Sequence, residues 1–320
     1  MCFGGIAVIL RYTEDTGGRT VYHVLRNTFH ASDTFVRRLR RTEAVRVNGT
    51  NVFTTARLAP GDLLTVDVLA AEPYCTVIPE IGSLDVLRED DGLLWINKPS
   101  GLLAHPSHSR MTGTLLNYVC GRQVSLCGNP CAHAVNRLDR DTSGVMLFSK
   151  NAYMKDRAER ALLSATSCKE YLALVSHPPS PSSGIIDAPI RRFRSLDMRR
   201  IVAPDGQSAI TLFETLRVFP EGFALVRLRL ETGRTHQIRV HMLYLGSPLL
   251  GDRLYGTEDS LALSSRLGVT AQALHAARLS IPHPITDEIV TVFAPVHRED
   301  LLRLVPKLEM PEFFWQNPSQ

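Results

Sequence analysis

The segment RLDRDTSG, residues 137–144, places a carboxylate between two guanidinium groups. Asp139 follows Arg137 by two residues and directly precedes Arg140. A carboxylate in this position either forms a structural ion pair or is kept ionised for a chemical task. An unperturbed aspartic acid has a pKa of roughly 3.9, and a nearby arginine lowers it, so we expect Asp139 to be charged at neutral pH. This segment alone leaves both interpretations open.

Three further stretches carry side chains that can do chemistry, each at a predicted strand end or turn. They are INKPSGLLAHPS (96–107), KEYLALV (169–175) and LETGRTHQIRVHMLYLGSPLLGDRLYG (230–256). Taken singly, each is weak evidence, since a polar residue on a strand is more often ordinary surface. Together they predict a cleft that holds an acid, arginines, a tyrosine and histidines.

The elements that must position these residues form two groups, and the first is a small α+β unit at residues 1–70. Apolar spacing predicts a helix over 21–30 and a second one after Ser32 or Asp33 as N-cap. A hairpin turning at Asn48-Gly49 follows. The second predicted helix carries an arginine cluster around the side opposite its apolar face, made of Arg37, Arg38, Arg40 and Arg41.

The second group follows a linker at 71–82 and fills residues 83–300, and a C-terminal tail is expected at 301–320. Short β-rich runs alternate here with Gly, Pro and Ser, with only a few helical stretches between them. Strands without regular βαβ alternation favour an α+β domain whose mixed, mainly antiparallel sheet is flanked by helices. Neither a Walker A nor a G-x-G-x-x-G motif is present, so no nucleotide cofactor is expected.

Composition narrows the class of protein. The 320 residues are 44% hydrophobic with a net charge of +4, and only five of the 36 basic residues are lysines. An excess of arginine suits phosphate binding, although a nucleotide bias in the gene would produce it too. No apolar run approaches the ~18 residues of a spanning helix. The first ten residues lack the basic start of a signal peptide, so a cytoplasmic protein is expected.

In order and spacing, the four stretches resemble the RluA/RluD-type family of RNA pseudouridine synthases. The resemblance covers about residues 83–295, including DMRRIVAPDGQSAIT and LHAARLSIPHP, and residues 1–70 resemble an S4-type RNA-binding domain. It implies a monomeric isomerase, without metal or cofactor, that detaches the uracil of a flipped uridine from C1′ and rejoins it through C5. Structured RNA is the implied partner, with ribosomal RNA favoured over transfer RNA.

The resemblance also implies roles for individual residues. Asp139 matches the catalytic aspartate, Arg239 the arginine that pairs with it, and Tyr171 the tyrosine that stacks on the target base and could act as a general base. The RNA-binding residues would be the arginine cluster of the first domain. The implied substrate-binding residues are Lys98, His105, Asn136, Arg137, Arg140, Arg234 and His236.

One residue departs from the family pattern. Asn136 stands where the family usually has a histidine, and an amide has no ring to stack and cannot be protonated. We interpret it as a mark of altered substrate preference, with His133 as a conceivable substitute. Asn136 also supports the alternative that the chain is a catalytically inactive RNA-binding protein of the same fold.

Two metal sites are conceivable. His105, His108 and His133 could serve a metal-dependent hydrolase, although the first two belong to a motif of the synthase family. Cys127 and Cys131 could join His133, but no second matching pair of ligands accompanies them. We therefore expect free thiols and no metal.

Overall fold

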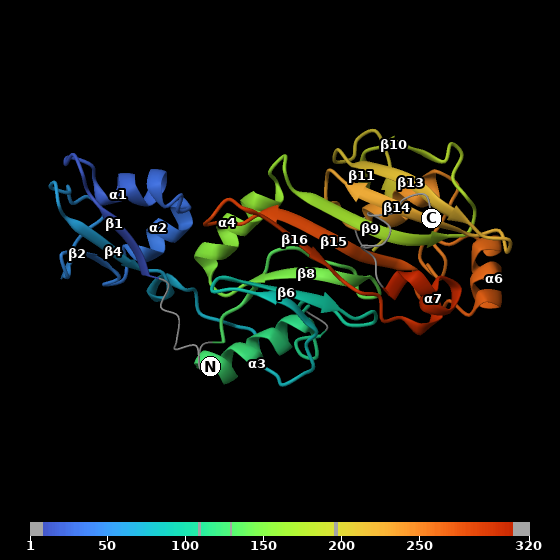
Figure 1. Cartoon of the computed structure of the whole chain (residues 1–320), viewed down its shortest axis with the longest axis horizontal. Helices are drawn as coiled ribbons and strands as arrows, with labels where there is room; N and C mark the ends of the chain where they lie inside the picture. The colour runs from blue at the N-terminus through green and yellow to red at the C-terminus, as the bar shows by residue number, and fades with distance from the viewer. Residues whose placement is uncertain (1–8, 108–109, 129, 195–197, 310–320) are drawn as a thin grey trace.

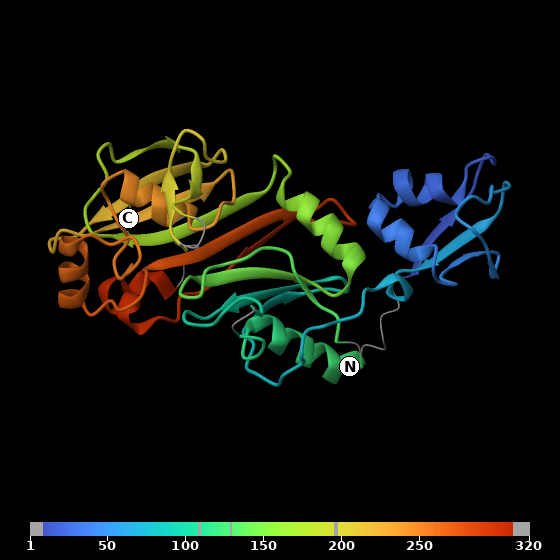
Figure 2. The same ribbon diagram turned by 180° about the vertical axis from the view of Figure 1, so that it is seen from behind.

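The computed structural model describes residues 9–107, 110–128, 130–194 and 198–309. The chain forms a small N-terminal lobe and a large lobe built on one long sheet (Figure 1). Seen from behind, the small lobe again stands at one end of the molecule, beside helix α4 (Figure 2).

The small lobe contains the predicted helices and hairpin. Helix α2 begins after Ser32, whose hydroxyl accepts the N–H of Phe35. The hairpin turns at Asn48 and Gly49, both with positive φ, as a two-residue type I′ turn requires. The four strands of the small lobe form a separate antiparallel sheet in the order β1-β4-β2-β3. The elements are β1 (Ile9–Thr13), α1 (Val21–His23), the π-helical turn η1 (Val24–Thr28), α2 (Asp33–Leu39), β2 (Val45–Val47), β3 (Thr50–Asn51), β4 (Leu63–Asp67) and η2 (Leu69–Ala71).

The large lobe is a ten-stranded mixed sheet. Eight strands follow the order β10-β13-β14-β9-β15-β8-β6-β5, while β16 pairs with β15 and β7 with β8. Among the described ladders only that between β8 and β15 is parallel, so the predicted mainly antiparallel sheet is confirmed. The strands are β5 (Val86–Glu89), β6 (Leu93–Lys98), β7 (His133–Ala134), β8 (Ser143–Ser149), β9 (Cys168–Val175), β10 (Ser183–Asp187), β13 (Ile210–Val218), β14 (Ala224–Leu230), β15 (Leu274–Pro282) and β16 (Ile289–Phe293). A separate hairpin pairs β11 (Ile190–Arg192) with β12 (Arg200–Val202).

Helices flank this sheet, and none that the structure describes is long and apolar enough to cross a membrane. Thr114 and Asn117 begin α3 with a capping box, each side chain accepting a backbone N–H of the other residue. Asn151 caps α4 in the same way as Ser32 caps α2. The helices are α3 (Leu115–Cys127), α4 (Ala152–Leu162), α5 (Gln237–Tyr244), α6 (Glu258–Leu267), α7 (Glu299–Leu304) and the 3-10 turn η3 (Pro306–Glu309).

The described part of the expected C-terminal tail belongs to the large lobe. Leu301, Val305 and Leu308 are buried in one apolar cluster with Leu172 of β9 and Leu225 of β14. Leu301 lies in α7, Val305 follows the end of that helix in a non-helical conformation, and Leu308 lies in η3, so the two short elements complete this cluster together. The large lobe therefore continues past residue 300, and residues 310–320 lie outside the described part.

The segments that carry Asp139 and Tyr171 meet at the centre of the sheet, where β15 lies between β8 and β9. Ala276 of β15 pairs with Gly144 on one side and with Tyr171 on the other. Gly144 has a φ of 113°, and a Cβ there would lie 2.2 Å from the carbonyl oxygen of Ala276. Only glycine allows β8 to approach β15 this closely.

A buried histidine fixes the start of β8. His275 Nε2 donates to the carbonyl of Ala294 at 2.8 Å, so Nδ1 is left to accept the hydroxyl of Ser143 at 2.9 Å. Burial lowers the pKa of His275 to about 4, which keeps this arrangement neutral and intact at physiological pH. Ser143 lies four residues after Asp139 and so limits where that loop can go.

We expect Gly144→Ala to lower the free energy of unfolding by about 3 kcal/mol or more, because the methyl group collides with backbone. Gly222 is a matched control, with a φ of 95° and nothing within 4 Å of an added Cβ. Gly222→Ala should cost only the left-handed strain of about 1–2 kcal/mol. Urea denaturation measures both, and equal losses would mean that the β8–β15 contact is not tight.

Candidate active site

Asp139 lies in the loop before β8 and points to a partner far along the chain. Its side chain is 27% exposed, and Arg239 Nη1 donates to its Oδ2 at 2.9 Å. The arginines beside it in sequence do not pair with it. Arg140 contacts both oxygens of Asp141 at 3.1 Å, and Arg137 is exposed. The expected Asp139–Arg239 pair is therefore present.

Asp252 holds Arg239 in place from the other side. The buried guanidinium of Arg239, on α5, donates through Nε and Nη2 to the two oxygens of Asp252 at 2.7 and 2.8 Å. The Asp252 carboxylate is fully buried and also accepts the N–H groups of Leu254 and Tyr255. Burial by itself lowers the pKa of Arg239. The negative charges and hydrogen bonds of Asp252 and then Asp139 raise this pKa by more than burial lowers it, so the net shift is upward.

This geometry gives the two carboxylates different tasks. Asp252 accepts from two of the three guanidinium nitrogens and is closed to solvent, so it acts as an anchor. Asp139 accepts one hydrogen bond on Oδ2, and its Oδ1 makes none with the described residues. A partly exposed carboxylate with a free oxygen can attack an electron-poor carbon or take up a proton.

His236 reaches Asp139 from the N-cap of α5 in a strained conformation. Its φ is 60°, in the left-handed region that a histidine rarely adopts. The Tyr255 hydroxyl accepts the N–H of Arg200 and so gives its own proton to His236 Nδ1, at 2.8 Å. Nε2 then carries the ring proton and faces Asp139 Oδ2 at 3.7 Å. Burial lowers the pKa of His236 more than Asp139 raises it, which favours the neutral ring.

Tyr171 lies on β9, across β15 from the Asp139 loop. Burial, and then the negative charge of Asp139, raise the pKa of Tyr171 well above its usual range. Its hydroxyl therefore stays protonated at neutral pH and can donate a hydrogen bond. Acting as a general base, as the family resemblance suggests, would first require removal of that proton.

Comparison with known proteins identifies the fold around these residues. Residues 92–244 match the family model described as RNA pseudouridylate synthase. An uncharacterized RNA pseudouridine synthase, YhcT of Bacillus subtilis (strain 168), is 37% identical over 91% of this chain and 93% of its own. Ribosomal large subunit pseudouridine synthase D of Xanthomonas campestris is 39% identical over 78% and 77%. The solved structure of human RNA Pseudouridylate Synthase Domain Containing 4 is 26% identical, with a TM-score of 0.57, and covers 69% of this chain and 92% of its own.

The chain belongs to the RNA pseudouridine synthase family. It is an enzyme, an isomerase that modifies RNA. The predicted family and fold are thereby confirmed, and the small lobe with its separate sheet is consistent with the predicted N-terminal domain.

In this synthase Lys98 lies beneath the Asp139 loop, although we expected it to bind substrate. It is fully buried, and its ammonium donates to the carbonyls of Pro99, Leu102 and Arg140 at 2.8–2.9 Å. These three acceptors use all three of its N–H groups, so none remains for RNA in this conformation. Burial lowers the pKa of Lys98 to about 7, with Asp141 and Asp139 opposing the shift. Lys98 therefore joins the segment 96–107 to the segment 137–144, which carries Asp139.

The remaining predicted substrate-binding residues lie mostly on the surface. Arg137 and His105 are exposed, and the pKa of His105 is lowered by partial burial and by the positive charge of Arg137. Arg234 is exposed and donates to the carbonyl of Ser208 at 2.9 Å. The exposed Arg140 is occupied by Asp141. The side chains of these four residues form no hydrogen bond or ion pair with Asp139, and their binding of substrate stays a prediction.

Asn136 has a structural partner in this synthase. Its Oδ1 accepts the backbone N–H of Leu147 at 2.7 Å and so ties the loop to β8. His133 does not replace the missing histidine in the cleft, because its Nε2 is held by Glu72 of the linker at 2.5 Å. The departure at Asn136 therefore leaves the Asp139–Arg239 pair unaffected.

The two conceivable metal sites find no support among the described residues, where no three His, Cys, Asp or Glu side chains converge as ligands. Cys127 contacts the carbonyl of Gln123 and Cys131 that of Pro73, while His133 pairs with Glu72. His108 lies outside the described residues.

Sequence reasoning missed three residues that organise this site, namely Asp252, Tyr255 and His275. The first two lie in GDRLYG, at the end of the stretch 230–256. An acid thirteen residues after Arg239 carries no helical or strand periodicity that would connect the two. The available signal was the pairs Gly251-Asp252 and Tyr255-Gly256, because these residue types are typical of turns. A turn that follows a polar segment can place its side chains beside a site.

We expect Arg239→Met to lower the free energy of unfolding by roughly 3–5 kcal/mol, because Asp252 would keep a buried charge without its partner. Arg239→Lys should lose less, since it keeps the charge but not the bidentate contact. Arg191, in an exposed pair with Asp205, provides the control, and Arg191→Met should cost at most about 1 kcal/mol. Urea denaturation gives all three values. A stable Arg239→Met variant would show that Asp252 does not need this arginine.

Proposed function

We propose that this synthase isomerises uridines in ribosomal RNA and that Asp139 is its nucleophile, acting on a flipped nucleotide. The single observation that carries the mechanism is the Asp139 carboxylate, anchored through Arg239 yet open at one oxygen. Relatives of this chain at 39% and 40% identity are titled ribosomal large subunit pseudouridine synthase D, which supports ribosomal RNA as the target.

In the proposed reaction Asp139 attacks an electron-poor carbon of the uridine while Arg239 holds the carboxylate in line. The N1–C1′ bond breaks, the uracil turns and a C5–C1′ bond forms. The bond between Asp139 and the uridine then breaks, which restores the free carboxylate. The C5 proton leaves and N1 gains a proton, so the reaction is an isomerisation with no other reactant. Extruding the uridine costs a few kcal/mol, which stacking on the Tyr171 ring would offset in part.

His236 has a supporting role in this proposal. Its Nε2–H faces Asp139 at 3.7 Å, within reach of the carboxylate after a small movement. A neutral donor at this distance can stabilise the carboxylate without neutralising it.

The proposed RNA contacts near the cleft come from exposed side chains around the loop. Arg137, Arg140, Arg234 and His105 would contact the phosphates or bases beside the target. Asn136 is already bonded to β8 and would first have to release Leu147 to take part.

The arginine cluster of the small lobe is proposed to bind RNA phosphates. Arg37, Arg40 and Arg41 are exposed at the end of α2, and Arg38 is half-buried over the ring of Phe35. Arg40 Nε donates to Thr54, which leaves the other guanidinium nitrogens toward solvent. We further propose that the enzyme acts as a monomer, since one chain supplies every residue of the site, and in the cytoplasm, as expected for free thiols.

Mapping pseudouridine in total RNA from a strain that lacks the gene tests the proposed function. We expect one or a few positions in ribosomal RNA to lose the modification. The unchanged gene should restore them, whereas Asp139→Asn should not, because an amide has the shape of the carboxylate without its charge. Asp139 is partly exposed, so the variant should remain folded. Loss confined to transfer RNA would contradict the proposed target, and restoration by Asp139→Asn would contradict the mechanism.

An inactive RNA-binding protein is the alternative that Asn136 suggested. Release of tritium from RNA labelled at C5 of uridine separates the two, because only turnover frees that proton. Release by the unchanged chain, and not by Asp139→Asn, would exclude the alternative.

We expect replacement of all four cluster arginines by Gln to weaken RNA binding and its salt dependence. The slope of log K against log salt should fall by roughly 0.7 for each phosphate that the variant no longer binds. Replacement by Lys keeps the charges and should preserve the slope, while turnover at saturating RNA should survive both changes. Fluorescence anisotropy at several salt concentrations measures the slopes. An unchanged slope in the Gln variant would mean that α2 faces only solvent.

A further inference from the structure

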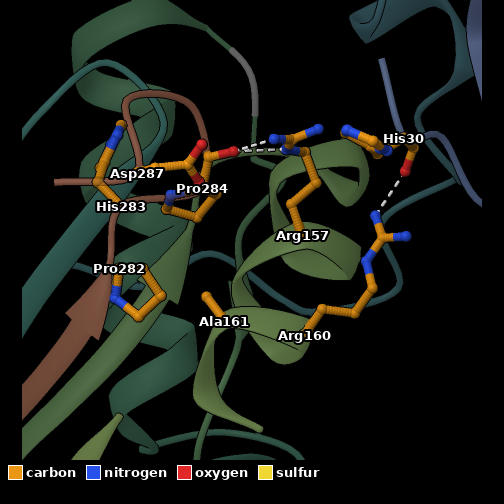
Figure 3. A pocket seen from close by; sticks show the side chains of 8 residues that line it. All are labelled: His30, Arg157, Arg160, Ala161, Pro282, His283, Pro284 and Asp287. Atoms are coloured by element: carbon orange, nitrogen blue, oxygen red, sulfur yellow. Dashed lines mark hydrogen bonds between the residues drawn. The ribbon is translucent and has the colours of Figure 1, made fainter. Parts of the chain in front are cut away.

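A cavity of about 310 Å³ lies where helix α4 meets the small lobe, away from Asp139. Figure 3 shows its lining, with His30 from the small lobe facing side chains of α4 and of the turn after β15. The residues that line it are His30, Arg157, Arg160, Ala161, Pro282, His283, Pro284 and Asp287.

Two arginines of α4 are held in this cavity by carbonyl groups. Arg157 donates to the carbonyl of Pro284 and, through Nη1, to that of Phe29 at 2.8 Å. Arg160 Nη2 donates to the carbonyl of His30 at 2.5 Å (Figure 3). These contacts fix the guanidinium groups without neutralising them. Arg160 is exposed, and its Nε and Nη1 make no hydrogen bond with the described residues.

The charges of this cavity are unbalanced. Within the described residues neither Arg157 nor Arg160 forms an ion pair with a carboxylate. Asp287 is the one acid of the described lining, and it is exposed. His283 directs its Nε2 to Asp90 at 3.4 Å, and on α4 itself Asp156 accepts the hydroxyl of Ser32 while Glu159 pairs with Lys155. Two fixed guanidinium groups with unused donors match the geometry of a phosphate.

The cavity lies along the strand that passes the catalytic residues. Ala276 of β15 pairs with Tyr171, and Pro282 ends the same strand six residues later. At ~3.3 Å per residue, Pro282 lies roughly 20 Å from that pairing. One strand of stacked nucleotides, at ~3.4 Å each, covers this distance in about six nucleotides. An RNA held at Asp139 is therefore long enough to reach the cavity.

We propose that this cavity binds a phosphate group of the RNA substrate, some six nucleotides from the modified uridine. Arg160, together with the remaining donor of Arg157, contacts the phosphate, and Pro282 and Ala161 form an apolar floor for the attached ribose. The inference rests on the proposed function only in that the partner is RNA. The inference adds a third place at which the protein would contact the RNA, between the arginine cluster of the small lobe and Asp139. The RNA strand would then be held by both lobes, whose separation is fixed.

Three substitutions test the cavity in the full chain. Arg160→Gln removes the exposed charge, and Ala161→Leu fills the space while keeping both arginines. Arg266→Gln is the matched control, because Arg266 is exposed in the last turn of α6 and also donates to a carbonyl, that of Glu221. Arg157 is left unchanged, since it holds the lobes together. Thermal unfolding verifies that each variant remains folded.

The readout is the binding of a fluorescein-labelled 30-nucleotide RNA hairpin with single-stranded flanks, by anisotropy at 0.1 M NaCl. We expect Arg160→Gln to weaken binding about tenfold, the effect of losing one hydrogen bond between charged groups. Ala161→Leu should weaken it to a similar extent, because the larger side chain keeps the phosphate from Arg160. Arg160→Lys should recover part of the loss, and Arg266→Gln should stay within twofold. Inorganic phosphate, added at constant ionic strength, should not displace the RNA.

Three outcomes would overturn the proposal. Equal losses in Arg160→Gln and Arg266→Gln, or unchanged binding in Ala161→Leu, would mean that surface charge and not the cavity attracts RNA. Both cavity variants could instead bind RNA normally but fail to bind inorganic phosphate, which the unchanged chain binds. That result would assign the site to a free phosphate and not to RNA. Because binding is measured without turnover, an Asp139→Asn chain gives the same test, and failure here is distinguishable from failure of the proposed function.

Discussion

The guanidinium of Arg239 is shared by two carboxylates, and the rest of the active site depends on that sharing. Asp252 is closed to solvent and grips two of its nitrogens, whereas Asp139 takes the third and stays partly open. Without Asp252 the arginine could turn toward Asp139 and neutralise it in a bidentate pair. Without Arg239 the Asp252 charge could not remain buried. One buried ion pair thus sets both the position of the Asp139 carboxylate and the number of hydrogen bonds that it accepts from Arg239.

The loop that carries Asp139 is held from below by buried side chains. The Lys98 ammonium joins three carbonyls on two motifs, and His275 fixes Ser143 at the start of β8. Gly144 lets β8 approach β15, so that Tyr171 on the next strand faces the same centre. A rigid platform of this kind keeps the carboxylate oriented before RNA arrives, which reduces the reorganisation needed during the reaction.

The two lobes are joined by more than their linker. Tyr153 of α4 donates to the carbonyl of Phe29 at 2.7 Å and packs against the ring of Phe35, while Asp156 accepts the hydroxyl of Ser32. These contacts orient the arginine cluster of α2 relative to the catalytic sheet. Under the proposed binding of RNA by the arginine cluster, this fixed geometry would restrict which uridines reach Asp139.

The sequence by itself determined the elements and the chemical groups. Apolar periodicity, the Ser32 cap and the Asn48-Gly49 turn are local properties, and so the helices, hairpin and antiparallel strands could be predicted from them. The pairing of Asp139 with Arg239 was available only through resemblance to a family, since a hundred residues separate the two. Tertiary structure alone decided that Lys98 is buried, that Asp252 anchors Arg239, and that residues past 300 complete the core. Each of these depends on which segments the β8–β15–β9 centre brings together, and burial and partner choice are set by that packing, which no local pattern encodes.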